Sequence, residues 1–203
     1  MENNYYNAIN KNTLKIVETL SKGKLYFNQI YELSGIKSKN NILKNLNLME
    51  VLKVVKKEKR KGNTFYSINH ENSFSTILMQ VGNIIKFQVL PFERKRAIEE
   101  VIDKTKPTLS ILFGSTAKGN FKKDSDIDLL FVFNSIPNKI KENINNISSR
   151  YGIRINPIII KFQNLDLKNE GIKHIFKTGY PISGYNYFYE VLKNVWLGKT
   201  NRR

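Results

Sequence analysis

The chain has 203 residues, enough for one large domain or two small ones, and 40% of them are hydrophobic, which excludes a disordered chain. No run of about eighteen apolar residues predicts a membrane span, and the absence of cysteine excludes disulfides and thiolate metal sites and favours the cytoplasm. The formal charge of +17 favours polyanionic partners but does not identify one.

The first third of the chain shows helical periodicity. Apolar residues recur at helical spacing in three stretches: residues 12–20, residues 25–33 and the segment after Ser38. Gly35 suits the position after a helix end, and the side chain of Ser38 can cap the helix that follows. We therefore expect three short helices, with a tight turn between the second and the third.

A hairpin is expected to follow these helices. Residues 51–56 and 64–68 have the composition of strands, and a charged turn is expected at residues 57–63. Three helices with a tight second turn, followed by a hairpin, resemble the winged helix-turn-helix domain of archaeal and bacterial regulators. We expect such a domain over residues 1–72.

The resemblance implies double-stranded DNA as the partner of this domain, with the third helix in the major groove and the hairpin on the phosphate backbone. Lysine and asparagine side chains suit phosphates and base edges. The candidate DNA-binding residues on these two elements are Lys39, Asn40, Lys44, Lys57, Lys59, Arg60 and Lys61. A solvated charge run and a protein-docking domain are the alternatives.

Residues 73–106 are expected to form a helical connector. Apolar stripes predict one helix over residues 74–90 and another over residues 92–104, with Pro91 between them. The first helix can equally serve in dimerisation, so a protein partner or a homodimer remains open. The third part of the chain is then residues 107–203.

Two apolar strands are expected within residues 109–133, with a polar stretch between them. Residues two apart on a strand share a face, so Asp126 and Asp128 project side by side from the start of the second strand. Two adjacent carboxylates at the rim of a buried strand repel each other unless a cation lies between them. Mg²⁺ takes such oxygen ligands together with substrate phosphates.

The first strand ends at Gly114-Ser115. Glycine allows the backbone to approach a phosphate closely, and Ser115 can start a short helix whose free N–H groups favour an anion. Ten residues separate this pair from Asp126. Residues 114–119 read GSTAKG and residues 124–129 read DSDIDL, which together resemble the signature of the nucleotidyltransferase superfamily that includes DNA polymerase β and the minimal nucleotidyltransferases.

The resemblance implies an enzyme that uses Mg²⁺ or Mn²⁺ to move a nucleoside monophosphate from an NTP to an unidentified hydroxyl. It assigns catalysis and metal binding to Asp126 and Asp128, and nucleotide binding to Gly114, Ser115 and Lys118. The expected fold class is α+β, with a winged helix domain, a helical connector and an α/β domain that contains a small mixed sheet.

Further elements are expected to complete the last domain. They are a helix from Pro137 to Tyr151, a strand over residues 153–161, short helices over residues 165–177, a turn at residues 179–184 and a final helix over residues 185–197. Pro157 favours an edge position or a bulge for the strand.

Members of the superfamily generally carry a third carboxylate on the strand after the motif helix, and here that strand offers Arg154 and Asn156. The next acids, Asp166 and Glu170, lie on expected helices, and nothing in the sequence places them near the first two. Nucleotide and Mg²⁺ binding are therefore better supported than turnover. A nucleotide-sensing DNA-binding regulator and a transferase-type antitoxin that acts on a toxin partner are the alternatives to the enzyme.

Overall fold

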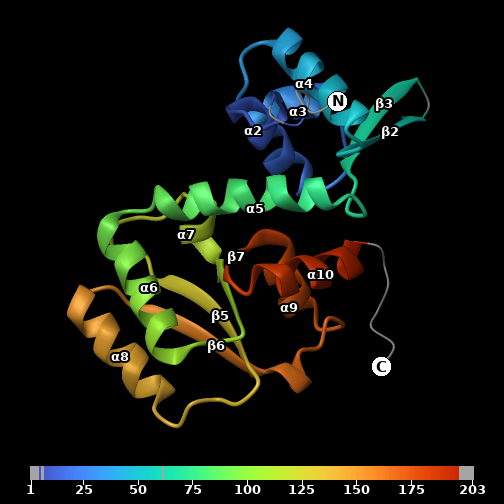
Figure 1. The fold of residues 1–203 in the computed structure, drawn as a ribbon. Helices are drawn as coiled ribbons and strands as arrows, with labels where there is room; N and C mark the ends of the chain where they lie inside the picture. Colours follow the sequence, from blue (N-terminus) through green and yellow to red (C-terminus); the bar gives the residue numbers. More distant parts are fainter. Residues whose placement is uncertain (1–4, 6, 61, 197–203) are drawn as a thin grey trace. The chain divides into compact units, whose positions relative to one another are not determined.

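The computed structural model describes residues 5, 7–60 and 62–196, and it divides the chain into two compact units, Met1–Gly82 and Asn83–Arg203 (Figure 1). The division lies inside helix α5 (Ser73–Gln88), so the expected connector, residues 73–106, is shared between the units. Among the described residues, no helix is both long and apolar enough to cross a membrane.

Three helices precede the hairpin in the described part of the first unit: α2 (Lys11–Leu20), α3 (Phe27–Ser34) and α4 (Lys39–Val51). Gly35 ends α3 in the left-handed conformation, with φ +64°, and the side chain of Ser38 caps α4 by accepting the backbone N–H of Asn41. The helix predicted at residues 25–33 begins late, because its first two residues form strand β1 (Leu25–Tyr26) and pair with the hairpin.

The strands of the first unit form an antiparallel sheet in the order β1-β3-β2, with β2 at Val55–Arg60 and β3 at Asn63–Ile68. The prediction of a strand at residues 51–56 and a charged turn at residues 57–63 is wrong in its bounds, because the strand begins at Val55 and ends at Arg60. Val51 ends α4, and the charged residues after Val55 belong to the strand. Their pairing with β3 outweighs the low strand propensity of lysine and glutamate.

Apolar side chains of these helices form the core of the first unit. Among the fully buried ones are Ile16, Ile30, Ile42, Leu46 and Met49. Leu33 and Leu43, which the helical spacing assigns to the interior, are 60% and 45% exposed. Asn45 of α4 is buried instead, and its Oδ1 accepts hydrogen bonds from Thr13 Oγ1 at 2.8 Å and from Asn10 Nδ2 at 3.1 Å. A polar cluster therefore joins α4 to the start of α2.

The second unit is built on a mixed four-stranded sheet in the order β6-β5-β4-β7. Its strands are β4 (Leu109–Phe113), β5 (Ile127–Phe133), β6 (Ile155–Lys161) and β7 (Tyr180–Ser183). Strand β5 runs antiparallel to β4 and parallel to β6. The small mixed sheet confirms the predicted α/β architecture of this part, and β6 lies at the edge where Pro157 removes no needed ladder donor.

Residues 179–184, predicted as a turn, contain strand β7. This short strand pairs antiparallel with β4, and Tyr180 and Ile182 are buried against the sheet core. Four residues with a proline among them give too little alternation for a strand to be recognised, so pairing with β4 decides the conformation.

Helices flank the sheet of the second unit: α6 (Phe92–Thr105), α7 (Gly114–Lys118), α8 (Ile140–Tyr151), α9 (Glu170–Thr178) and α10 (Tyr185–Trp196), with a 3₁₀ turn at Phe162–Asn164. Leu129 and Phe131 of β5 pack with α6 and α8 in one buried cluster. Because side chains alternate along a strand, Asp128 and Leu130 project from the opposite face. Helices α9 and α10 contact β4.

Candidate active site

Two carboxylates meet at the edge where β5 begins, as the sequence predicts. Asp126 directly precedes β5, and Asp128 lies two residues further along, opposite Phe113 of β4 and opposite Asn156 of β6 in the strand register. We call Asp126 and Asp128 the carboxylate pair. The pairing of β5 with its two neighbouring strands thus fixes the position of the carboxylate pair. For this reason the two acids, which are two residues apart in the sequence, are also close in space.

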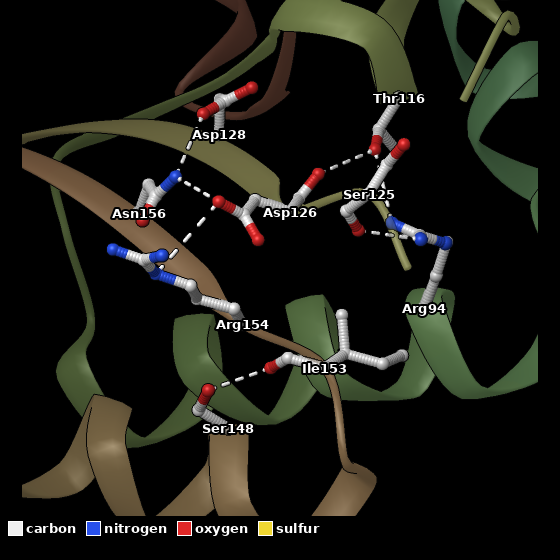
Figure 2. Close-up of polar contacts among 9 residues, drawn as sticks. All are labelled: Arg94, Thr116, Ser125, Asp126, Asp128, Ser148, Ile153, Arg154 and Asn156. Carbon is white, nitrogen blue, oxygen red and sulfur yellow. Dashed lines mark hydrogen bonds and ion pairs between the residues drawn. The ribbon is translucent and has the colours of Figure 1, made fainter. Parts of the chain in front are cut away.

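Asn156 lies between the two acids, as Figure 2 shows. Its Nδ2 donates to Asp126 Oδ2 at 2.8 Å and to Asp128 Oδ1 at 3.4 Å. The nearest charged partner of the pair is Arg154, whose Nε lies 3.8 Å from Asp126 Oδ2 and whose side chain is 77% exposed. Of the two residues that the sequence offers for the third-carboxylate position, Asn156 is therefore the one that hydrogen-bonds both acids.

Gly114 is required by the closeness of the carboxylate pair. Its φ is +71°, a left-handed conformation that glycine adopts without strain. A Cβ placed on Gly114 would lie 2.1 Å from Asp128 Oδ2 and 3.0 Å from its Cγ. The side chain of Asp128 therefore packs directly on the Gly114 backbone, and the Gly-Ser and Asp-x-Asp motifs form one structural unit.

The other predicted nucleotide-binding residues follow in α7. Ser115 is half-buried in the first turn of this five-residue helix, and Lys118 is exposed at its last residue, before Gly119 ends the helix with φ +73°. Their backbone positions therefore lie on the same short segment that begins at Gly114.

The downstream acids do not join the carboxylate pair. Asp166 accepts the backbone N–H of Lys168 at 2.8 Å, and Glu170 accepts a hydrogen bond from Lys173 at 2.8 Å. Over the described residues, no group of three or more histidine, cysteine, aspartate or glutamate side chains is arranged to hold a metal ion. Among the described residues, the side chains that meet at this site are therefore two carboxylates and the Asn156 amide beside them.

Sequence reasoning missed Arg94, a buried cation behind the site. Only 3% of Arg94 is exposed, and its Nη1 donates to Thr116 Oγ1 of α7 at 3.2 Å. Thr116 Oγ1 in turn donates to the backbone oxygen of Asp126 at 3.2 Å (Figure 2). Burial lowers the pKa of Arg94, and the charge of Asp126 opposes that shift. The available signal was an arginine in the apolar stripe of α6, four residues before the buried Ile98.

In the first unit, the predicted DNA-binding residues are exposed on two elements. Those of α4 are Lys39, Asn40 and Lys44, those of β2 are Lys57, Lys59 and Arg60, and Lys61 lies outside the described residues. Two of the β2 cations have acidic neighbours, because Lys57 donates to Glu50 at 3.2 Å and Arg60 pairs with Glu58.

These contacts shift the pKa of Lys57 and of Glu58. The hydrogen bond to Glu50 raises the pKa of Lys57 above its ordinary value. Hydrogen bonds from Lys24 and Arg60 lower the pKa of Glu58. The hairpin is therefore a mixed-charge surface with an excess of cations, and acids offset part of the positive charge on β2.

Comparison with known proteins decides the family. A family model described as "Nucleotidyltransferase domain" matches residues 94–179. A protein of Methanocaldococcus jannaschii named "Putative protein adenylyltransferase MJ0141" is 38% identical over 88 residues, which cover 41% of this chain and 82% of that relative. The chain belongs to the nucleotidyltransferase family. The predicted superfamily and the predicted transferase class are therefore confirmed.

Two further similarities accompany this nucleotidyltransferase. "Putative protein adenylyltransferase MJ1305" of the same organism is 35% identical over 66 residues, which cover 29% of this chain and only 45% of that relative. A chain of the solved structure described as "Crystal structure of the toxin-antitoxin with AMP-PNP" aligns with a TM-score of 0.40 and 16% identity, over 53% of this chain and 89% of that chain. A TM-score of this size supports no conclusion about ligands or partners.

Proposed function

We propose that the second unit transfers AMP from ATP to a hydroxyl group on a protein, with a divalent cation held by Asp126 and Asp128. The observation that carries this proposal is the carboxylate pair at the start of β5, packed against the Gly114 backbone. The names of the two Methanocaldococcus jannaschii relatives support the adenylyl group and the protein acceptor.

The residues of the site fit Mg²⁺ or Mn²⁺. One oxygen of each carboxylate lies near the same nitrogen, because Asn156 Nδ2 bridges Asp126 and Asp128. Magnesium prefers oxygen ligands and commonly binds through one or two carboxylates together with substrate phosphates, so Asp126 and Asp128 are the proposed ligands. When bound, the ion would offset phosphate charge and make the acceptor hydroxyl easier to deprotonate.

The protein's own contribution is positioning. The strand register holds Asp126 and Asp128 on one rim, and Gly114 leaves room for the Asp128 side chain where any other residue would displace it. Ser115 and Lys118 lie on the same short segment and are the proposed contacts for the nucleotide phosphates. Holding the reacting groups in fixed geometry accounts for a large share of the barrier reduction in such transfers.

The test is the response of the full chain to ATP. Thermal unfolding with ATP and Mg²⁺ should show stabilisation of about 2.7 kcal/mol at a hundredfold excess over Kd. Labelled ATP should release pyrophosphate and label a protein acceptor. Asp126→Asn combined with Asp128→Asn should remove the Mg²⁺-dependent part of both signals.

A matched control separates the site from the loss of negative charge. Asp103 and Asp166 are exposed acids outside the carboxylate pair, and Asp103→Asn with Asp166→Asn should respond to ATP like the unchanged chain. Equal thermal shifts with Mg²⁺ and with EDTA in every variant would reject the site assignment. Binding without pyrophosphate release would favour the nucleotide sensor over the transferase.

A second function is proposed for the first unit, which we infer to be a winged helix that binds double-stranded DNA. The order α2, β1, α3, α4, β2, β3 supports it, because this succession places a helix after a tight turn and a basic hairpin after that helix. Cations are exposed on both elements, and Gly35 provides the tight turn between α3 and α4.

Salt dependence tests the DNA proposal. The affinity of the full chain for a duplex should fall with salt at a log–log slope of about −0.9 per phosphate contact, so Lys59→Ala with Arg60→Ala should flatten the slope by about two units. Lys11→Ala with Lys22→Ala removes the same charge from exposed positions away from β2 and should leave the slope almost unchanged. An equal effect of both double variants would assign the binding to net charge alone.

A further inference from the structure

We propose that Arg94 is a positioning residue of the transferase site, which holds the connection between α7 and β5 so that Asp126 stays beside Asp128. The effect of Arg94 on the reaction rate rests on the proposed function, whereas its effect on the structure of the loop before Asp126 does not. Arg94 lies 32 residues before Asp126 in the sequence, on a different element, and nothing in the motif itself points to it.

Arg94 is the buried charge of the second unit. In the described part of the chain it is the one lysine, arginine, histidine, aspartate or glutamate that is buried, with 3% of its surface exposed. No carboxylate oxygen of the described residues lies within ion-pair distance of its guanidinium. A buried cation is costly unless hydrogen bonds satisfy it, so the groups that surround Arg94 must supply acceptors.

Three of the four acceptors belong to the segment that leads into the carboxylate pair. Nη2 of Arg94 donates to the backbone oxygens of Lys122, Lys123 and Ser125, at 3.1, 3.1 and 2.7 Å. The guanidinium also lies over the ring of Phe121, with 4.6 Å between Cζ and the ring centroid. One planar group therefore contacts four of the five loop residues from Phe121 to Ser125.

The other nitrogen of the guanidinium reaches the motif helix. Nη1 donates to Thr116 Oγ1, and this hydroxyl donates onward to the backbone oxygen of Asp126 (Figure 2). Thr116 is itself buried, with 1% of its surface exposed. The chain of contacts from Arg94 through Thr116 to Asp126 joins α6, α7 and the start of β5.

The position of these contacts gives Arg94 a function beyond general stability. Helix α7 begins at Gly114, whose backbone lies against Asp128, and the clamped loop ends at Asp126. Arg94 therefore sets the position of one carboxylate relative to the segment that contacts the other. Lysine cannot replace it, because an ammonium group lacks the fixed planar fork that reaches four acceptors at once.

Hydrogen exchange of the nucleotide-free full chain tests the clamp without any assumption about activity. Arg94→Lys keeps the charge but loses the fork, so amides of residues 119–126 should exchange at least about tenfold faster, while amides of α8 remain unchanged. Thr116→Val is the second variant, with a similar shape but no hydroxyl, and Thr116→Ser retains the bridge. Arg96→Lys, an exposed change on the same helix, is the matched control.

Steady-state kinetics then tests the consequence for the site. Because misplacement of a catalytic group by about 1 Å can cost about a hundredfold in rate, Arg94→Lys and Thr116→Val should lower kcat by about that factor and change the KM for ATP much less. Thr116→Ser should restore most of the rate.

Several results would overturn the inference. Unchanged exchange of residues 119–126 in Arg94→Lys would show that no clamp exists, and faster exchange of α8 to the same extent would make Arg94 a general stabilising residue. An unchanged kcat in an active protein would remove its link to the site. If the unchanged chain transfers nothing, the proposed function fails, and the exchange measurements still decide the clamp.

Discussion

Replacing Asn156 by aspartate is the sharpest test of the site geometry. Asn156 lies opposite Asp128 in the strand register, and its Nδ2 bonds both members of the carboxylate pair. Asn156→Asp would exchange a donor for a third carboxylate in nearly the same space. We expect the metal-free variant to be less stable than the unchanged chain, and we expect Mg²⁺ to restore its stability.

The distances set the size of the effect. An oxygen at the place of Nδ2 would lie 2.8 Å from Asp126 and 3.4 Å from Asp128. At 3.4 Å, Coulomb repulsion between unit charges is about 1 kcal/mol in water and about 5 kcal/mol at an effective dielectric constant of about 20. The Asp126 side chain is 33% exposed, which favours the lower part of this range. Including the lost hydrogen bonds, we expect a loss of about 2–4 kcal/mol in EDTA.

Urea unfolding followed by the hydrogen exchange of the β5 amides is a suitable assay, because β5 belongs to the unit that contains the site. Asn145→Asp introduces the same charge at an exposed position of α8 and should show neither the loss in EDTA nor the gain with Mg²⁺. If Asn156→Asp and Asn145→Asp behave alike, Asn156 does not occupy the third-ligand position.

Two further predictions concern individual residues. Gly114→Ala should lower the free energy of unfolding by more than the roughly 1–2 kcal/mol that an alanine costs in the left-handed conformation, and it should abolish the thermal shift with Mg²⁺ and ATP. Gly119→Ala is the control: Gly119 has φ +73° but open space around the added Cβ, so this change should cost only the conformational 1–2 kcal/mol, again roughly. Burial lowers the pKa of His70 to about 4 in the folded chain. Between about pH 6.5 and about pH 4 the unfolded chain therefore binds a proton at His70 that the folded chain does not bind, so stability should fall as the pH decreases through this range. His70→Gln should reduce this fall in acid titrations, and an unchanged fall in that variant would contradict the prediction.

The central motif could be predicted because its geometry is local. Alternation along β5 places Asp126 and Asp128 on one face, and ten residues between Ser115 and Asp126 leave room only for α7 and a short return loop. Gly114 was identified as a position of close approach, although its nearest neighbour in the structure is the Asp128 side chain. The strand alternation and the residue spacing are therefore enough to predict the positions of the two acids and of the turn, without contacts from the rest of the chain.

The remaining features depend on contacts between distant segments. Strands β1 and β7 are too short to show periodicity, and each exists because a longer strand pairs with it. Arg154 directly precedes β6 and Asn156 is its second residue, so only the register of β6 against β5 distinguishes their positions. Arg94 could not be identified for a similar reason, since three of its four acceptors are backbone oxygens, which carry no signal in the sequence.

The charge balance of the site connects these observations. Two carboxylates, a neutral amide and the Arg154 guanidinium near Asp126 give the group a formal charge of about −1, against −2 with a third acid. A free divalent cation is attracted weakly by such a group, whereas a cation that arrives with a triphosphate brings its own negative oxygens as ligands. In the proposed transferase, Mg²⁺ alone should therefore stabilise the unchanged chain little, and nucleotide and metal should bind together. Arg154, whose side chain is 77% exposed, would then pair with Asp126 in the empty site and with a phosphate in the occupied one.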